Sequence, residues 1–552
     1  MDFSLYSISS KLFFLYLLYR LIYFIKLYIN GRRTGFPVYI VPLPTKTIPW
    51  LVLAPALRHH LERYLPGWIY ERLDVTIHGW EFQRKAEMHR RLGKAFAVVS
   101  LDECSLWVAD PAAGTVILQR RKDFLQSPLS AKIVGLLGPN VIGANGEDWQ
   151  RQRRVVAPNL NERISETVWN ESCQQAGTML EYLEKNPGGE TLDGLRSIAI
   201  NVIGQAGFGQ YQPWSPDVRS LAENAGSKGG RAAYFGALSL VTDKIVEAAL
   251  VSPKFLQMGF MPSATRLLGH HMENIPQYVT DMLEEERGIV NKGSGPRSNF
   301  LSMLVQLSDK EKGTGSSGTS LTEDEISGNL FAFTAAGFDT TANTMGYAVI
   351  VLAAYPEWQD WIREELHNLK PDISTGKYEE VFPRCQRVLA LMLETLRHFP
   401  PVSHSTRHVS EPQQFTDSSG THMLNPPMDV YVSHQSIHCD PEIWGPDVLD
   451  FDPTRWIDKT TGQVITPPKG TYLPWSGGPR VCPGIKMSQV EFVATLATLF
   501  RSGRCEPLPS PGREKPEEMR QRLRELMADS ISKLTLQVRN PKEVRLRWVR
   551  DA

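Results

Sequence analysis

The sequence predicts a mainly helical protein with a small β portion, preceded by a separate apolar helix at the N-terminus. Long segments with helical periodicity fill most of the chain, and they include one helix-compatible stretch of more than thirty residues, from Thr322 to about Tyr355. Short strand-like runs and turns gather between Arg407 and Val432. Regular alternation of strands and helices is missing, which argues against a parallel α/β sheet.

Composition limits the class of protein further. The chain has 552 residues, of which 42% are apolar, so it can bury a large core and is not predicted to be disordered. Sixty basic and sixty acidic residues cancel, which leaves no overall field to attract nucleic acid. The six cysteines form no CxxC pair, which excludes a disulfide scaffold and a zinc ribbon and indicates reduced thiols facing the cytosol.

The N-terminal segment, residues 1–30, is predicted to be a membrane anchor. Residues 12–29 are nearly continuous apolar sequence of about the length that crosses a bilayer. Their apolar side chains contribute roughly −4 to −7 kcal/mol to insertion, against about +3 kcal/mol for the central Arg20. A polar stripe containing Arg20 leaves open a helix that lies in the membrane interface. Arg32 and Arg33 follow, which places the rest of the chain on the cytoplasmic side.

Three further segments complete the predicted organisation. Residues 31–49 contain "GFPVYIVPLP" and are interpreted as a stiff, proline-rich hinge. Residues 50–552 are predicted to form one functional domain without internal repeats. Within it, residues 308–320 ("SDKEKGTGSSGTS") have the composition of a linker. Thr322 and Glu325 then form a capping-box pattern that starts the longest helix, and the segments "EWQDWIREELHNL" and "QRVLALMLETLRHF" predict two more helices.

The middle of the longest helix contains an unusual motif, "AAGFDTT", at residues 335–341. Glycine costs about 1 kcal/mol in a helix interior, and a threonine hydroxyl can compete for a backbone carbonyl and open the helix locally. Local rules broken in a buried helix suggest a site. Gly337 would admit a flat ligand against the backbone, and Asp339 with Thr340 would form a proton relay. The alternative is a kinked helix with a buried, satisfied Asp339.

Two other helical motifs combine arginine with a possible partner. In "ETLR", Glu394 and Arg397 share one helix face and can pair, and Arg455 of "FDPTRW" could bind the same carboxylate. An ordinary surface ion pair is the commoner explanation of such a pattern. In "GEDWQRQRRVV", Trp149 and Arg153 are four residues apart and could present two donors to one anion. A basic surface helix is the alternative.

The loop "LPWSGGPRVCPGIKM", residues 473–487, contains the cysteine that needs its own explanation. Cys482 lies where a glycine-rich loop enters a helix, and the N-terminal dipole of that helix favours a thiolate. Gly478 and Gly484 keep side chains away, Arg480 supplies a cation and Trp475 an aromatic wall. A thiolate bound to iron in a macrocycle accounts for all of these residues, whereas a nucleophile accounts for the sulfur alone.

These motifs, in this order, resemble those of the cytochrome P-450 haem-thiolate monooxygenases over roughly residues 50 to 540. The haem loop of that family places an aromatic residue, glycine, arginine, cysteine and glycine as Trp475, Gly478, Arg480, Cys482 and Gly484 are placed here. Trp475 replaces the phenylalanine that is usual in the family. The N-terminal anchor and the long, loop-rich chain resemble microsomal, fungal members.

The resemblance implies roles for individual residues. Cys482 would be the axial ligand of the haem iron, and Thr340 with Asp339 would deliver protons. The other positions group by role: Ala336 and Gly337 match the oxygen-binding groove; Trp149, Arg153, Arg407 and Arg480 match the propionate-binding positions; Glu394, Arg397 and Arg455 match a structural triad; Ser403, His404 and Phe333 are candidates for the substrate pocket. His404 bonded to the backbone or to another side chain is the alternative for that residue.

The expected function is therefore oxidation of a small, largely apolar molecule by O₂ at a haem, in secondary-metabolite biosynthesis. Electrons would come from NADPH through a separate reductase, with cytochrome b5 as a further candidate partner. The protein would be anchored in the endoplasmic reticulum membrane with its catalytic domain in the cytoplasm. Two alternatives stay open: a haem-thiolate enzyme that isomerises peroxides or dehydrates its substrate, and a haem-binding membrane protein without enzymatic activity.

Overall fold

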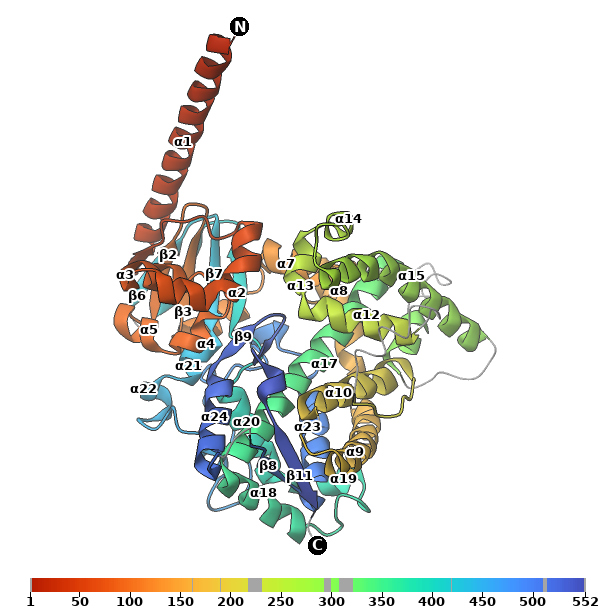
Figure 1. The fold of residues 1–552 in the computed structure, drawn as a ribbon. Coiled ribbons are helices and arrows are strands. Elements are labelled where there is room, and N and C mark those ends of the chain that lie inside the picture. The colour runs from red at the N-terminus through yellow and green to blue at the C-terminus, as the bar shows by residue number, and fades with distance from the viewer. Residues whose placement is uncertain are drawn as a thin grey trace. The chain divides into compact units, whose positions relative to one another are not determined.

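The computed structural model describes residues 2–160, 162–188, 190–216, 231–291, 299–306, 321–417, 419–509 and 514–550. The chain divides into two compact units, each built from separated segments. Unit 1 comprises residues 1–128, 403–448 and 468–481, and unit 2 comprises residues 129–402, 449–467 and 482–552. The segment predicted as a linker, residues 308–320, lies outside the described residues. Figure 1 shows the elements of both units.

Unit 1 combines two long helices, α1 and α2, and several short ones with most of the longer strands. Its helices are α1 (Asp2–Arg33), α2 (Ile48–Tyr64), α3 (Gly67–Asp74), α4 (Trp80–Arg84), α5 (Glu87–Leu92), α6 (Pro111–Gln119), α21 (His434–His438) and α22 (Pro441–Trp444). Its strands are β1 (Val38–Ile40), β2 (Ala95–Val99), β3 (Cys104–Val108), β4 (His404–Val409), β5 (Gln413–Asp417), β6 (Gly420–Leu424) and β7 (Met428–Ser433).

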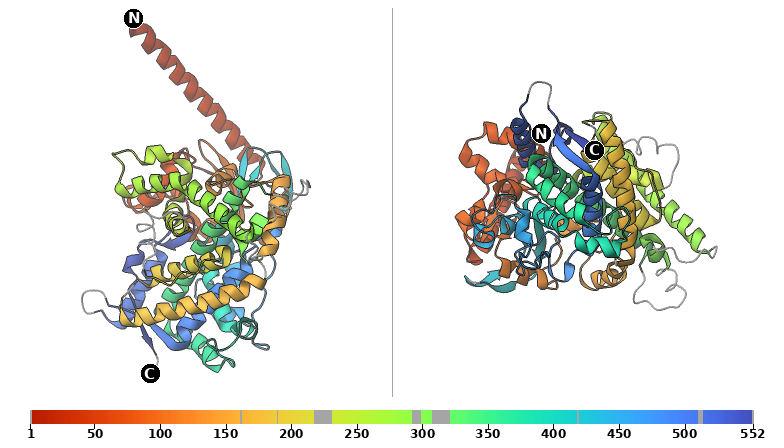
Figure 2. Two further views of the ribbon diagram at one scale, coloured as in Figure 1. Left: turned by 90° about the vertical axis from the view of Figure 1, so that its right-hand side faces the viewer. Right: turned by 90° about the horizontal axis from the view of Figure 1, so that it is seen from below.

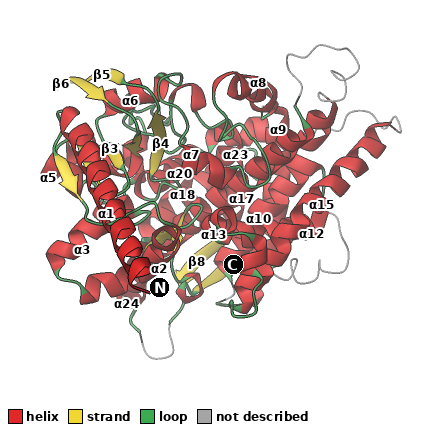
Figure 3. Ribbon diagram, turned by 90° about the horizontal axis from the view of Figure 1, so that it is seen from above, coloured by secondary structure: helices red, strands yellow, loops and turns green. Residues whose placement is uncertain are grey.

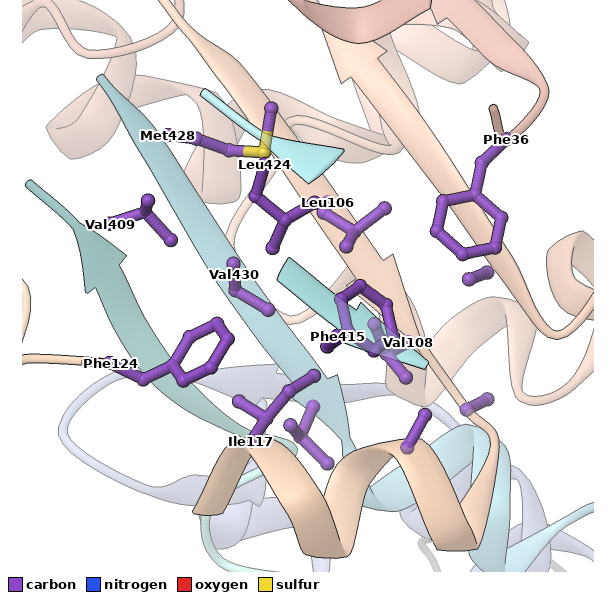
Figure 4. Close-up of a cluster of buried hydrophobic side chains, with 14 of the residues drawn as sticks. Phe36, Leu106, Val108, Ile117, Phe124, Val409, Phe415, Leu424, Met428 and Val430 are labelled. Atoms are coloured by element: carbon purple, nitrogen blue, oxygen red, sulfur yellow. The ribbon is translucent and has the colours of Figure 1, made fainter. Parts of the chain in front are cut away.

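The main sheet of unit 1 has the strand order β1-β2-β3-β7-β4, and β5 pairs with β6 in a separate hairpin. Val430 of β7 lies opposite Leu106 of β3 and Arg407 of β4, so these strands present one face together. Apolar side chains from that face pack against α6, where Ile117 is fully buried (Figure 4). The strand-rich region predicted between Arg407 and Val432 is confirmed.

Unit 2 is mostly helical. Its helices are α7 (Pro128–Val134, which begins at the last residue of unit 1), α8 (Gly146–Val156), α9 (Glu162–Lys185), α10 (Thr191–Phe208), α12 (Arg231–Asp243), α13 (Ile245–Leu250), α14 (Pro253–Leu256), α15 (Ser263–Asn291), α17 (Glu323–Ala354), α18 (Pro356–Asn368), α19 (Tyr378–Val381), α20 (Gln386–His398), α23 (Ile485–Ser502) and α24 (Pro516–Ala528). Its strands are β8 (Gly503–Pro507), β9 (Ser530–Ser532), β10 (Leu536–Val538) and β11 (Leu546–Arg550). Helices dominate the secondary structure, as predicted (Figure 3).

Helix α17 begins and ends where the sequence predicts. The Thr322 hydroxyl accepts the Glu325 N–H at 3.1 Å, and the Glu325 carboxylate accepts the Thr322 N–H at 2.9 Å. These two bonds satisfy donors that a helix start leaves unpaired. Most of the side chains along α17 are buried, so this helix lies in the core of unit 2.

The N-terminal helix differs in part from the predicted anchor. By length and composition, residues 11–33 of α1 could cross a membrane, and an 18-residue window within them has a mean hydropathy of 1.7. Figure 1 and Figure 2 show the first part of α1 projecting from the rest of unit 1. Its last part, however, packs on the sheet: Leu27 is fully buried, and Arg20 donates to the Leu101 carbonyl at 3.1 Å. Arg20 therefore has a protein partner, rather than lying midway along a free helix.

The segment predicted as a hinge, residues 31–49, is bound to unit 1. Residues 38–40 form β1, which pairs in parallel with β2 at the edge of the sheet. Further along, Thr45 N–H donates to Asp102 at 2.8 Å, and Lys46 forms ion pairs with Glu103 and Asp429 at 2.7 and 2.6 Å. The proline-flanked sequence favours extended backbone, and here that backbone serves as an edge strand.

Deleting residues 1–19 should release the protein into the soluble fraction without changing its melting temperature, because the removed part projects from unit 1. Deleting residues 1–30 should also lower stability, since burial of Leu27 alone contributes roughly 1.5–3 kcal/mol. Membrane fractionation and thermal unfolding of both variants check this. Equal melting temperatures would show that the end of α1 adds nothing to unit 1.

Candidate functional site

The predicted site residues are divided between the two units. Unit 2 contains Cys482 and Gly484, the α8 pair, the middle of α17 and the Glu394 group. Unit 1 contains Arg407, Ser403, His404 and the loop residues Trp475, Gly478 and Arg480. Each group is described within its own unit.

Cys482 lies directly before α23 in unit 2 and is partly exposed. Its sulfur accepts a weak hydrogen bond from the Gly484 N–H at 3.4 Å. Burial raises the pKa of the Cys482 thiol, while the Gly484 N–H and the positive charge of Arg153 act in the opposite direction. The Gly484 N–H and Arg153 favour the thiolate, and burial opposes it. A bound metal ion would add to the stability of the thiolate, since coordination deprotonates a thiol.

Trp149 and Arg153 lie on α8, as the sequence predicts. Trp149 is 6% exposed, which argues against the alternative of a purely surface helix. Arg153 is half-buried, and burial lowers its pKa, whereas the charge of Cys482 raises it. The structure thus places a guanidinium within electrostatic reach of the sulfur. On the other side of the helix, Arg151 binds Glu325 of α17 at 2.6 Å.

The loop before Cys482 depends on backbone conformations that few residues adopt. Gly478 has φ +66°, and a Cβ there would lie 2.4 Å from the Leu118 carbonyl oxygen, so only glycine fits. Ser476 also has a positive φ, of 61°. Its hydroxyl is hydrogen-bonded to Ser405 at 2.7 Å, and Ser405 is bonded in turn to His434 at 2.9 Å. These contacts hold the turn, and Trp475 packs edge-on to Tyr472.

Arg407 is a buried cation on β4. The residue is 4% exposed, and burial lowers the pKa of its guanidinium to about 10. Nη1 donates to the Thr406 carbonyl at 2.8 Å, whereas Nε is buried without a hydrogen-bond partner among the described residues. An unpaired buried donor is costly, so this arrangement suits an anionic ligand that brings an acceptor. Arg480 lies in unit 1 as well, at the end of a short 3₁₀ helix (Gly478–Arg480).

The AAGFDTT motif leaves α17 continuous. Thr340 Oγ1 donates to the Ala336 carbonyl at 2.7 Å, and Thr341 Oγ1 donates to the Gly337 carbonyl at 3.1 Å. A Cβ on Gly337 would lie 2.7 Å from Ile203 Cδ1 of α10. Close packing of α10 against α17 therefore explains the glycine without a ligand, and the predicted local opening of the helix is not observed.

Asp339 is 4% exposed and has two strong partners. Arg196 Nη1 of α10 donates to Oδ1 at 2.8 Å, and Thr535 Oγ1 donates to Oδ2 at 2.6 Å. The carboxyl group is thus buried and satisfied, which is what the alternative interpretation of the motif describes. Asp339 can still transfer protons although both of its oxygens are hydrogen-bonded, but one of these two bonds must break first.

The candidate pocket residues have different surroundings. His404 Nδ1 contacts Glu81 in unit 1, and the bond to this fully buried carboxylate supports the alternative in which His404 is held by another side chain. Burial would raise the pKa of Glu81, but the positive charge and hydrogen bond of His404 lower it. By contrast, Ser403 Oγ is buried without a partner among the described residues. Phe333 of α17 stacks on Phe300, with ring centroids 4.4 Å apart.

Glu394 forms the most completely buried ion cluster among the predicted residues. Arg397 donates to both carboxylate oxygens at 2.8 Å, and Arg455 donates to Oε1 at 3.1 Å. Trp456 Nε1 and the Asp452 N–H complete the shell at 2.8 and 3.0 Å. Burial would raise the pKa of Glu394, but the bonds from Arg397 and His398 hold it well below its usual range. A surface ion pair is excluded, because Glu394 and Arg397 are both fully buried.

Glu394→Ala should cost about 3–5 kcal/mol of folding free energy, because it leaves the fully buried Arg397 guanidinium without its anion and also removes the partner of Arg455. The measurement is chemical denaturation of the purified variant. Glu364→Ala is the matched control. Glu364 lies on α18 and forms an exposed ion pair with Arg387 of α20, so its loss should have a much smaller effect on the free energy of unfolding. Equal losses in the two variants would show that the Glu394 cluster carries no special stability.

Several functional contacts lie outside the predicted set. Arg196 and Thr535 bind Asp339 from positions 143 and 196 residues away, and no local pattern in the sequence marks them. Glu81, the partner of His404, is separated from it by 323 residues. Trp456, by contrast, could have been predicted from the sequence, because it directly follows Arg455 in "FDPTRW".

Known proteins resemble this chain along most of its length. The sequence model of the family described as cytochrome P-450 matches residues 75–530. The match leaves out residues 1–74, which contain α1, β1, α2 and α3, and residues 531–552, which contain β10 and β11.

Individual relatives align over almost the whole chain. A phomenoic acid biosynthesis cluster cytochrome P-450 monooxygenase of Leptosphaeria maculans is 31% identical, over 91% of this chain and 92% of its own length. Cytochrome P-450 monooxygenase prx9 of Penicillium rubens is 28% identical, over 91% of each chain. Cytochrome P-450 monooxygenase ORF6 of Penicillium roqueforti is 28% identical, over 90% of each chain.

Proposed function

This chain belongs to the cytochrome P-450 family and is a monooxygenase, and from that premise we propose that Cys482 binds the iron of a haem. The observation that carries the proposal is the Cys482 sulfur at the start of α23, with the Gly484 N–H at 3.4 Å and the charge of Arg153 nearby. When bound, haem would activate O₂ and supply one oxygen atom to the substrate.

The residues of both units fit such a group. Cys482 would supply the sulfur ligand to the haem iron. Arg407, with its buried unpartnered Nε, Arg480, Arg153 and Trp149 would donate to the propionates. Gly484 lies beside the sulfur in unit 2, and in unit 1 Trp475 would supply an aromatic wall and Gly478 the sharp turn of the loop.

Protons for oxygen activation would come through α17. The Thr340 hydroxyl donates to the Ala336 carbonyl, which leaves its oxygen free to accept another hydrogen bond. Asp339 would take up a proton and pass it on, in the role of a general acid. Asp339 can pass a proton towards Thr340 only after it releases one of its two partners. The breaking of that bond would therefore control proton transfer.

The substrate we propose is a small, largely apolar molecule of secondary metabolism. The relative from Leptosphaeria maculans is named for a biosynthesis cluster, which supports a tailoring role. The Ser403 hydroxyl, which has no partner among the described residues, would orient a substrate oxygen, as a few polar groups do in apolar pockets.

Electrons would come from NADPH through a separate reductase, with cytochrome b5 as a second donor. Helix α1 would hold the protein in the endoplasmic reticulum membrane, with both units in the cytoplasm.

Cys482→Ser should abolish the red-shifted Soret band of the ferrous–carbonyl complex, because that band depends on thiolate ligation. Cys173→Ser, another partly buried cysteine of unit 2, is the matched control and should keep the band. Absorption spectra of both purified variants provide the measurement. A retained band in folded Cys482→Ser would disprove the ligand assignment.

Thr340→Ala should keep haem and NADPH consumption but release more hydrogen peroxide per NADPH, because proton delivery is impaired. General acid–base groups contribute about 10²–10⁴-fold, so productive turnover should fall by a factor approaching that range. Thr344→Ala, which removes a comparable hydroxyl bonded to the Thr340 carbonyl at 2.8 Å, is the control. The substrate for this assay would come from screening the enzyme and its reductase against a metabolite extract.

Full coupling in Thr340→Ala would instead favour a haem-thiolate enzyme that isomerises peroxides or dehydrates its substrate, since that chemistry needs no proton relay. The third alternative, a haem-binding protein without activity, predicts that the wild-type protein consumes no NADPH in the presence of the reductase.

A further inference from the structure

The hairpin β9–β10 lies along α17 in unit 2 and is bonded to it by side chains. The two strands pair in antiparallel register, with Leu536 opposite Ser532. The Lys533 N–H donates to the Thr535 carbonyl at 3.0 Å and closes the turn between them. Thr535, in that turn, is only 3% exposed. Its side chain therefore points into the protein and not into solvent.

The hydroxyl of Thr535 has two partners on α17. It donates to Asp339 Oδ2 at 2.6 Å and accepts from Asn343 Nδ2 at 2.8 Å. Because an amide N–H can only donate, the hydroxyl hydrogen must point towards Asp339. One further bond holds the hairpin: Ser530 Oγ lies 2.7 Å from Tyr347 Oη. Asp339, Asn343 and Tyr347 follow one another at four-residue spacing, so they lie along one side of the helix.

The other oxygen of Asp339 is held more firmly. Arg196 donates to Oδ1 at 2.8 Å, and the same guanidinium contacts the Thr242 hydroxyl at 3.3 Å and Asp243 at 3.5 Å. It also lies over the Phe338 ring, 4.9 Å from the centroid. Breaking this buried ion pair would leave uncompensated charges, whereas breaking the Thr535 bond exposes only a neutral hydroxyl.

We propose that Thr535 is the positioning residue for proton transfer by Asp339, and that Oδ2 is the oxygen through which Asp339 exchanges protons. The inference rests on the proposed function of Asp339. Arg196 fixes the carboxyl group by Oδ1, and Thr535 orients Oδ2 until a movement of the hairpin releases it. Oδ2 then takes one proton from solvent and passes one towards the site at Thr340, so the carboxyl group is unchanged over a cycle.

The test compares Thr535→Val, which removes the hydroxyl at nearly constant shape, with Thr535→Ser, which keeps it. Full-length protein and its reductase are assayed for NADPH oxidation, peroxide released per NADPH, and the solvent deuterium isotope effect. Thr535→Val should slow NADPH oxidation by about tenfold, below the range of a directly acting acid or base, and should increase both the isotope effect and peroxide release. Thr535→Ser should restore wild-type values.

Ser530→Ala is the matched control, because it breaks the Tyr347 bond of the same hairpin and leaves Asp339 untouched. Melting temperatures and ferrous–carbonyl spectra verify that all three variants are folded and carry haem. An unchanged isotope effect in Thr535→Val, or an equal change in Ser530→Ala, would overturn the proposal. Loss of NADPH oxidation in the wild type itself would contradict the proposed function instead, so the two failures are distinguishable.

Discussion

The buried carboxylate of Glu394 is the contact on which the organisation of unit 2 depends. It binds Arg397 on its own helix and Arg455 from a segment 61 residues further along the chain. The Arg397 guanidinium is fully buried and needs this anion, and the bond to Arg455 ties α20 to the short 3₁₀ helix Pro453–Trp456. The indole N–H of Trp456 donates to the second carboxylate oxygen of Glu394 and completes its set of protein hydrogen bonds.

Helix α17 supplies the second constraint, because the same few turns pack the core and hold the chemistry. Its threonine hydroxyls bond to carbonyls of the preceding turn, and the helix nevertheless stays continuous where its composition is least favourable. Gly337 lets α10 approach closely, and that approach brings Arg196 to Asp339. A site built on a rigid helix in this way is more precise than one built on loops.

Some predictions were changed by contacts between distant parts of the chain. The proline-rich residues 31–49, predicted as a stiff hinge, add strand β1 to a sheet whose other strands lie farther along the sequence. The sequence predicts Arg20 to be a charge within a bilayer, yet its guanidinium donates to the Leu101 carbonyl. It also makes His404 a candidate for the pocket, and in the structure Glu81 binds the Nδ1 of His404. Each of these partners lies beyond the reach of any local pattern.

The sequence by itself determined the fold class, the family, the bounds of α17 and the identity of Cys482, Thr340 and Glu394 as the residues to examine. These follow from helical periodicity, a capping box and motif spacing, all of which act over a few neighbouring residues. Only the tertiary structure decided which oxygen of Asp339 is held by an arginine and which by a hydroxyl, and that burial raises the pKa of the Cys482 thiol. Desolvation and buried hydrogen bonds depend on which distant segments come into contact in the fold. Local patterns in the sequence do not show those contacts.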